Sequence, residues 1–108
     1  MLKYNIKDMK DGWLIGNFEP SILKTKNFEV GVLKHHKGQQ WPDHYHNNVT
    51  EYNLLLKGKM YINDILINVN DIFVLKPKEI ARPIFVEDCE ILCIKVPSVI
   101  GDKVEVNK

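Results

Sequence analysis

Frequent turn residues divide this chain into short apolar segments, and that spacing is the feature that most constrains its fold. Helical periodicity is nearly absent, and residues 21–24 could form one helical turn at most. The segments with β-strand character are 13–15, 28–33, 51–56, 59–62, 65–67, 72–75, 81–86 and 90–96. Eight or so short strands at regular spacing predict an all-β sandwich or barrel. The loop Asn63-Asp64 predicts a tight hairpin between two of them.

Two of the expected strands are apolar at consecutive positions. They are Asn-Leu-Leu-Leu at 53–56 and Ile-Phe-Val-Leu at 72–75. A strand has this character when one face packs on the core and the other against a second sheet or a partner subunit. The pattern is therefore compatible with a homodimer.

Size and charge limit the class of protein. We expect one domain from 108 residues. The net charge is +1 with acids and bases interleaved, so no nucleic-acid partner is predicted. No apolar run is long enough for a membrane span and no secretory leader is visible, which predicts a cytoplasmic protein without a membrane partner.

The two cysteines, Cys89 and Cys93, lie in or beside the expected strand 90–96. Four residues of strand span about 13 Å, whereas a disulfide requires Cα atoms within about 7 Å. They cannot bridge each other, and buried reduced thiols fit the cytosol.

The polar residues between Gly38 and Gly58 carry the most specific chemistry, with the spacing G-x5-H-x-H-x4-E-x6-G. His44 and His46 stand at i and i+2, so they project from the same face of an extended strand. Glu51 follows five residues later. Two imidazoles and a carboxylate are donors that a divalent transition metal accepts. We therefore predict these three residues as metal ligands.

This spacing resembles the first conserved motif of the cupins, G-x5-H-x-H-x3,4-E-x6-G, and meets all five of its defining positions. The resemblance covers about residues 28–96 and implies a jelly-roll β-barrel (double-stranded β-helix), with residues 1–108 as a single cupin domain. Most cupins hold Fe, Mn, Ni or Zn with this motif inside the barrel. Small cupins commonly form homodimers through their sheets. The resemblance thus implies that His44, His46 and Glu51 face one cavity.

The second cupin motif, G-x5-P-x-G-x2-H-x3-N, is degenerate here. Residues 70–85 keep the expected strand and Pro77 but lack both glycines, the histidine and the asparagine. Ala81 or Arg82, depending on register, stands where the histidine belongs. Two histidines and a carboxylate suffice for a facial triad with open positions. The alternative is a polar, hydrogen-bonded interior without metal.

Three residues are predicted to bind substrate. Arg82 is the single arginine, and if it points inward it would attract an anionic ligand and repel a divalent ion; alternatively it points outward. Asn53 shares parity with Glu51 and should face the cavity. Trp41 either forms a hydrophobic wall for a small ligand or packs outside the barrel.

The catalytic residues remain open, with His35, Tyr52 and Arg82 as candidates. His35 and His36 are adjacent, so only one of them can face the interior. His35 could replace the missing ligand or act as a general base. Tyr52 could donate a phenolic proton, although its parity relative to Glu51 is uncertain.

The predicted function is a small cupin that binds a divalent transition metal and a small polar, anionic metabolite, as an isomerase, lyase or dioxygenase. Two alternatives stay open: a metal-free enzyme of the sugar epimerase or ketoisomerase kind, and a non-catalytic small-molecule-binding cupin.

Overall fold

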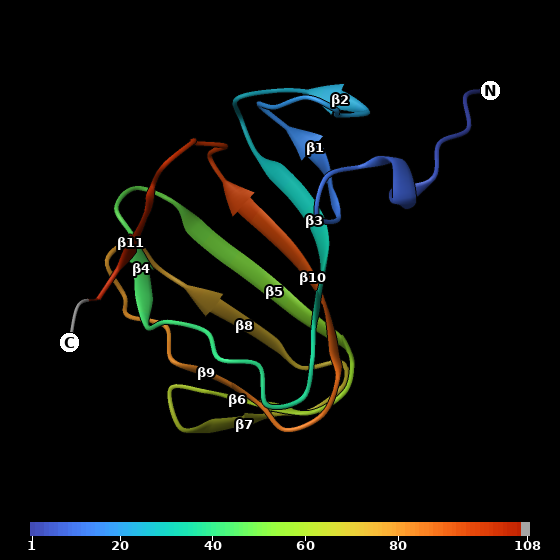
Figure 1. Ribbon diagram of the computed structural model, residues 1–108. Coiled ribbons are helices and arrows are strands. Elements are labelled where there is room, and N and C mark those ends of the chain that lie inside the picture. Colours follow the sequence, from blue (N-terminus) through green and yellow to red (C-terminus); the bar gives the residue numbers. More distant parts are fainter. Residues whose placement is uncertain (107–108) are drawn as a thin grey trace.

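The computed structural model describes residues 1–106, which form strands joined by short turns (Figure 1). The elements are η1 (Ile6–Asp8), β1 (Trp13–Gly16), β2 (Leu23–Lys24), β3 (Glu29–His35), β4 (His44–His46), β5 (Thr50–Lys57), β6 (Met60–Ile62), β7 (Ile65–Ile67), β8 (Ile72–Leu75), β9 (Pro83–Phe85), β10 (Cys89–Val96) and β11 (Lys103–Glu105). The predicted all-β fold is confirmed. The suggested helical turn at 21–24 is wrong, because Leu23–Lys24 pairs in parallel with β1. No helix within 1–106 is long and apolar enough to cross a membrane.

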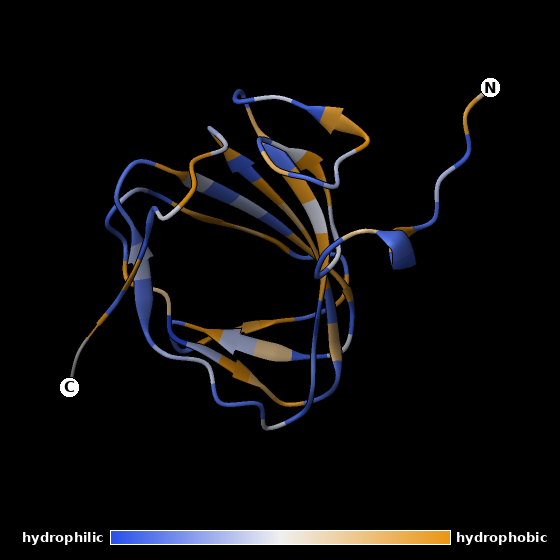
Figure 2. Cartoon of the chain, turned by 45° about the horizontal axis from the view of Figure 1, so that its top comes forward, coloured by the Kyte–Doolittle hydropathy of each residue, from blue (hydrophilic) through white to orange (hydrophobic). Residues whose placement is uncertain are grey.

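The strands form a jelly roll with two facing walls. One wall is a six-stranded sheet in the order β2-β1-β3-β10-β5-β8. The other consists of the sheet β7-β6-β9 and the pair β11-β4. Figure 2 shows the two walls facing each other, with polar and apolar residues alternating along strands of the large sheet. The sheets remain separate hydrogen-bonded units, so the jelly roll is not one closed ladder.

The register of the large sheet determines which side chains face the interior. Cys93 of β10 pairs with Gly31 of β3 on one side and with Asn53 of β5 on the other. Lys95 pairs in the same way with Glu29 and with Glu51. Because side chains alternate along a strand, these rows all point to the interior. Residues of even number in β3, β5, β8 and β10 point outward.

The apolar core fills one end of the interior and leaves the other end to polar residues. Its buried members come from both walls: Leu55, Met60, Ile62, Ile67, Leu75, Ala81, Phe85, Cys89 and Ile91. Leu55 is completely buried. This packing holds the two walls apart at a fixed distance, so the polar end can stay open without collapsing.

The predicted hairpin at Asn63-Asp64 is confirmed and also supports the second wall. Both residues have positive φ, 51° and 65°, as a type I′ turn requires. The Asn63 amide donates to the carbonyl of Ile80 at 2.9 Å, and its oxygen accepts the backbone N–H of Arg82 at 2.8 Å. The hairpin thereby holds residues 80–82 in place. Ala81, in the middle of this segment, pairs with His44 of β4, where the candidate site begins.

Candidate functional site

The three predicted metal ligands face one cavity at the polar end of the jelly roll. His44 and His46 come from β4 and are buried, at 7% and 6% exposure. Glu51 comes from the start of β5. All three line a cavity of about 390 Å³, which is within the size range of small-molecule sites. The i, i+2 spacing therefore places both rings inward, as expected.

Strand β4 is held from both sides, which fixes the backbone that carries the two imidazoles. On one side the His44 N–H donates to the Ala81 carbonyl at 3.2 Å, and the Ala81 N–H donates back at 2.7 Å. On the other side β4 pairs with β11. Ala81 lines the cavity, so it, rather than Arg82, occupies the inward position of the degenerate second motif.

His46 and Glu51 form a buried pair. His46 Nε2 lies 3.1 Å from Glu51 Oε2. Burial alone would raise the pKa of the Glu51 carboxyl, but the hydrogen bond from His46 and the charge of Lys95 oppose burial and hold the pKa below its usual value. The Asn53 amide adds a smaller contribution in the same direction. Glu51 is therefore an anion at neutral pH.

His44 is anchored so that one ring nitrogen is left for a ligand. Its Nδ1 lies 3.1 Å from the Pro42 carbonyl, an acceptor that assigns the ring proton to Nδ1. Burial lowers the pKa of the imidazole, which favours the neutral form. A histidine whose Nδ1–H donates to a carbonyl presents Nε2 to a metal in many metal sites.

The donors fit a divalent transition metal in chemistry, and one pair also fits in spacing. Two neighbouring ligands, each about 2.1 Å from an ion, stand roughly 3 Å apart, close to the 3.1 Å between His46 and Glu51. The centroids of the His44 and His46 rings are 5.6 Å apart. Within residues 1–106 no three His, Cys, Asp or Glu side chains are gathered closely enough to hold an ion. Completing the set requires His44 to move toward the His46–Glu51 pair.

His35 faces the cavity and His36 does not, as adjacent strand positions require. The His35 ring stacks on Phe85 with centroids 4.3 Å apart. Its Nδ1 lies 3.2 Å from the Gln39 side-chain nitrogen. His35 therefore forms part of the cavity wall, and its role as base or replacement ligand remains a prediction.

Burial of His35 should make the protein less stable in mild acid. Burial lowers the pKa of this imidazole from 6.5, so below that pH the unfolded chain binds more protons than the folded one. The contribution of His35 to the free energy of unfolding is fully present above pH 6.5. It is lost as the pH falls, by at most about 1.4 kcal/mol per pH unit for each such group. Urea unfolding between pH 7 and 5 should give a shallower loss for His35→Asn than for wild type. Equal slopes would contradict this expectation.

Asn53 and Trp41 both line the cavity. Strand alternation predicted this for Asn53, and the interpretation of Trp41 as a hydrophobic wall predicted it for Trp41. Asn53 is 3% exposed and lines the cavity, as does Trp41. The Asn53 amide is near enough to Glu51 to lower the pKa of that carboxyl, but within residues 1–106 its Nδ2 has no partner at hydrogen-bond geometry. Since a buried amide without a partner is costly, this nitrogen is suited to an acceptor atom on a ligand. Their predicted substrate-binding roles are untested.

Two candidate residues do not face the cavity. The Arg82 side chain is 59% exposed and its Nε lies 3.3 Å from Asp43 Oδ2. The expectation of an inward Arg82 is corrected: Ala81 takes the inward position and Arg82, next along the chain, points out. Tyr52 is 45% exposed on the face opposite its neighbour Glu51, so it cannot donate a proton within the cavity.

Among the cavity residues that were not predicted from the sequence are Trp13, Lys95 and Lys103. Lys95 of β10 pairs with Glu51 of β5, and this strand register cannot be predicted from the local sequence. Lys103 was assigned to a charged tail, but β11 pairs with β4. The only available signal was an apolar residue, Val104, between two charged ones.

No protein-family model matches the sequence, and no curated protein is significantly similar to it. Solved structures are similar. A Klebsiella pneumoniae subsp. pneumoniae MGH 78578 protein with a double-stranded beta-helix domain is 21% identical, covers 81% of this chain and 76% of its own, and has a TM-score of 0.68. A cupin-2 domain protein of Shewanella frigidimarina is 18% identical, covers 69% of this chain and 76% of its own, and has a TM-score of 0.56.

The DMSP lyase DddQ of Ruegeria pomeroyi DSS-3 is 14% identical, covers 87% of this chain and has a TM-score of 0.73. This chain spans only about half of that lyase, 49%. At these identities the likeness concerns the fold. The chain has the jelly-roll fold of these cupin and double-stranded beta-helix structures, which confirms the fold that the first motif implied.

Proposed function

We propose that this protein is a small cupin enzyme in which His44, His46 and Glu51 hold a divalent transition metal next to a small polar metabolite. The observation that carries the proposal is the buried His46–Glu51 pair at 3.1 Å, with the anchored His44 on the same cavity. A bound ion would polarise a substrate oxygen as a Lewis acid. The fold is shared with a lyase, which supports the proposal without specifying the reaction.

The residues of the chain would divide the remaining work. The degenerate second motif places the small Ala81 beside His44, which leaves room for substrate where a fourth ligand would stand. The unpartnered Asn53 amide would donate to a substrate oxygen. Trp41 and Phe73 would form an apolar part of the cavity wall. Metal analysis of protein purified without chelators or nickel resin tests this function.

A metal-free acid–base enzyme is the second candidate, and the same pair favours it. Glu51 is held as an anion beside His46, so His46 could give or take a proton while Glu51 orients its ring. Two lysines on the same cavity, Lys95 and Lys103, would oppose a divalent cation. A site that stays empty in the presence of added metals would favour this candidate.

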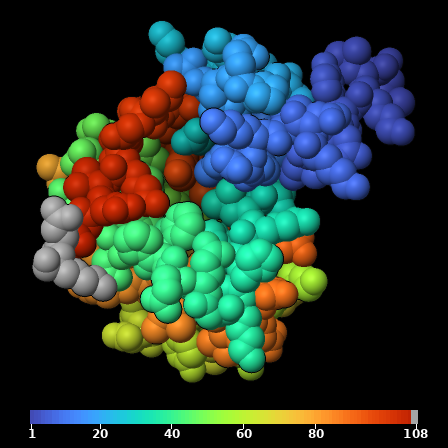
Figure 3. Space-filling model, viewed as in Figure 1, coloured from blue at the N-terminus to red at the C-terminus, as the bar shows by residue number. Residues whose placement is uncertain are grey.

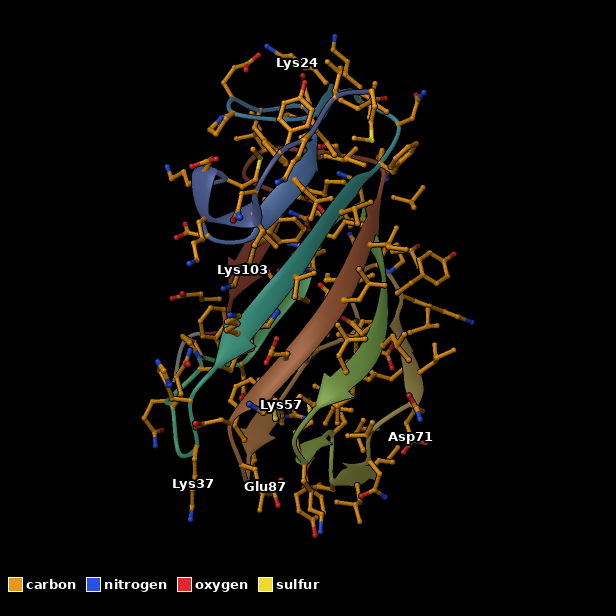
Figure 4. All side chains as sticks on the ribbon, turned by 90° about the vertical axis from the view of Figure 1, so that its right-hand side faces the viewer. Lys24, Lys37, Lys57, Asp71, Glu87 and Lys103 are labelled. Carbon is orange, nitrogen blue, oxygen red and sulfur yellow. The ribbon has the colours of Figure 1, made fainter. Side chains whose placement is uncertain are left out.

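The homodimer remains a proposal, and the outer face of the large sheet supports it. Two rows of apolar side chains cross four strands there: Val32, Leu92, Leu54 and Ile72 in one row, and Val30, Ile94, Tyr52 and Val74 in the other. Figure 4 views the molecule from this side, with β3, β10 and β5 in front. An apolar sheet face is the kind of surface that a second copy covers in an isologous contact.

Substitution of Ile72 should weaken that dimer. Ile72 is 71% exposed in one subunit, so Ile72→Lys should leave the fold intact while placing a charge in the interface. We expect sedimentation to show a dimer for wild type and at least about tenfold weaker association for the variant. Ile65→Lys, 63% exposed on β7, is the control. A specific dimer should still be present at roughly 100 µM protein. A wild type that is monomeric at that concentration would contradict the proposal.

A cytoplasmic location also remains a proposal. Cys89 and Cys93 are both buried and unbonded, and burial raises the pKa of each thiol. Such cysteines stay protonated and unreactive, as expected in a reducing compartment.

A further inference from the structure

Three lysines that the proposed metal site does not use line the same cavity: Lys34, Lys95 and Lys103. Lys95 comes from β10 and Lys103 from β11, and both border the cavity with Glu51. Within residues 1–106, neither ammonium forms an ion pair with a carboxylate. Lys95 is half-buried between Glu29 and Glu51 of the neighbouring strands, whereas Lys103 is exposed. The cavity lining has three lysines, Lys34 included, against two carboxylates, Asp11 and Glu51, so positive charge is available to a ligand.

Each of the two ammonium groups is positioned by an indole ring. Lys95 Nζ lies 4.9 Å from the ring centroid of Trp13, and Lys103 Nζ lies 4.4 Å from that of Trp41. Trp13 packs closely on β3, because a Cβ at Gly31 would come within 2.6 Å of its ring. Cation–π contact holds an ammonium in place without using up its N–H donors. Those donors remain available in the cavity.

The C-terminal segment brings Lys103 to the cavity. Asp102 is buried and its carboxylate accepts the backbone N–H groups of Asn48 and Val49, both at 3.0 Å. The next residue, Lys103, then pairs directly opposite His46. Figure 3 shows this C-terminal segment (red) against the chain that includes β4 (green). The second lysine is thus fixed beside a predicted metal ligand by a dedicated set of hydrogen bonds.

Lys95 and Lys103 line the same cavity from different strands. An anion between the two ammonium groups would reduce the repulsion between these like charges. It would also give charge-assisted hydrogen bonds, which are stronger than neutral ones.

We infer that Lys95 and Lys103 bind the anionic group of the substrate, a carboxylate or a phosphate, and place its reacting end beside His44, His46 and Glu51. This inference rests on the proposed function of the same cavity. It replaces Arg82, which points away, as the recognition element for the anion. It also makes the C-terminal strand β11 a part of the substrate site.

Isothermal titration with inorganic phosphate, and separately with malonate, tests the assignment. We expect wild type to bind at least one of them saturably, and the tighter one identifies the anion class. Lys95→Gln and Lys103→Gln should each weaken binding about tenfold or more, and Lys103→Arg should retain most of it. Lys59→Gln makes the same charge change at an exposed position and should bind like wild type.

The outcomes separate this inference from the proposed metal site. Circular dichroism and bound metal are measured on the same samples, and we expect the lysine variants to remain folded with unchanged metal content. Anion binding that both lysine variants retain, or no anion binding by wild type, would overturn the inference. A protein that binds anion through these lysines but takes up no metal would instead overturn the metal site alone.

Discussion

Gly58→Ala should lower the free energy of unfolding by about 3 kcal/mol or more, a large effect for a single methyl group. Gly58 has φ +94°, where a side chain is strained. A Cβ there would also stand 2.2 Å from the Asp88 carbonyl oxygen and 2.9 Å from Cys89 Sγ. The carbonyl belongs to the backbone entering β10, so it cannot move without shifting the central strand of the large sheet.

Gly38→Ala is the matched control for that substitution. Gly38 is the other glycine of the motif and also has positive φ, +72°, but a Cβ there meets nothing within 4 Å. It should cost only the backbone strain, about 1 kcal/mol. Urea unfolding of both variants gives the comparison. Equal losses would show that the close approach to Asp88 does not explain why a glycine stands at position 58.

Glu51→Gln should reduce metal affinity at least about a hundredfold while leaving the protein folded. The substitution keeps the shape of the side chain but removes its charge. It also removes the carboxylate oxygen that His46 contacts at 3.1 Å. Competition with a chromophoric chelator for Zn(II) measures the change.

Glu29→Gln provides the control, because Glu29 lies across from Lys95 in the same row of the large sheet, on the side away from Glu51. Its carboxylate accepts a hydrogen bond from Ser98 Oγ at 3.4 Å and does not line the cavity. It should bind Zn(II) as wild type does. Equal loss in both variants would indicate a general effect of charge around Lys95 instead of a ligand at position 51.

Local patterns in the sequence were sufficient to predict the first motif and most of the strands, but not β2 or β11. The strand at 72–75 and the loop Asn63-Asp64 are found where turn residues and apolar alternation put them. His44 and His46 face one way because they are two residues apart on β4. Alternation within one strand also placed Asn53 on the Glu51 side. Each of these relations lies within a few residues of the chain.

Relations between distant segments could not be predicted in the same way. Arg82 and Ala81 both fitted the degenerate motif, and only the pairing of Ala81 with His44 shows which one faces inward. In the sequence, Lys103 is one charged residue among several near the C-terminus. Its position at the cavity depends on the hydrogen bonds of its neighbour Asp102 to residues 48 and 49, more than fifty positions away. Strand partners and register depend on the whole fold, so local composition does not carry them.

The metal content of the wild-type protein, purified without chelators and without nickel resin, tests the account most directly. We predict close to one transition-metal ion per chain, lost in His46→Ala and retained in His36→Ala, whose histidine is exposed. A wild-type site that is empty, and that stays empty after Fe(II), Mn(II), Ni(II) and Zn(II) are added, would contradict it.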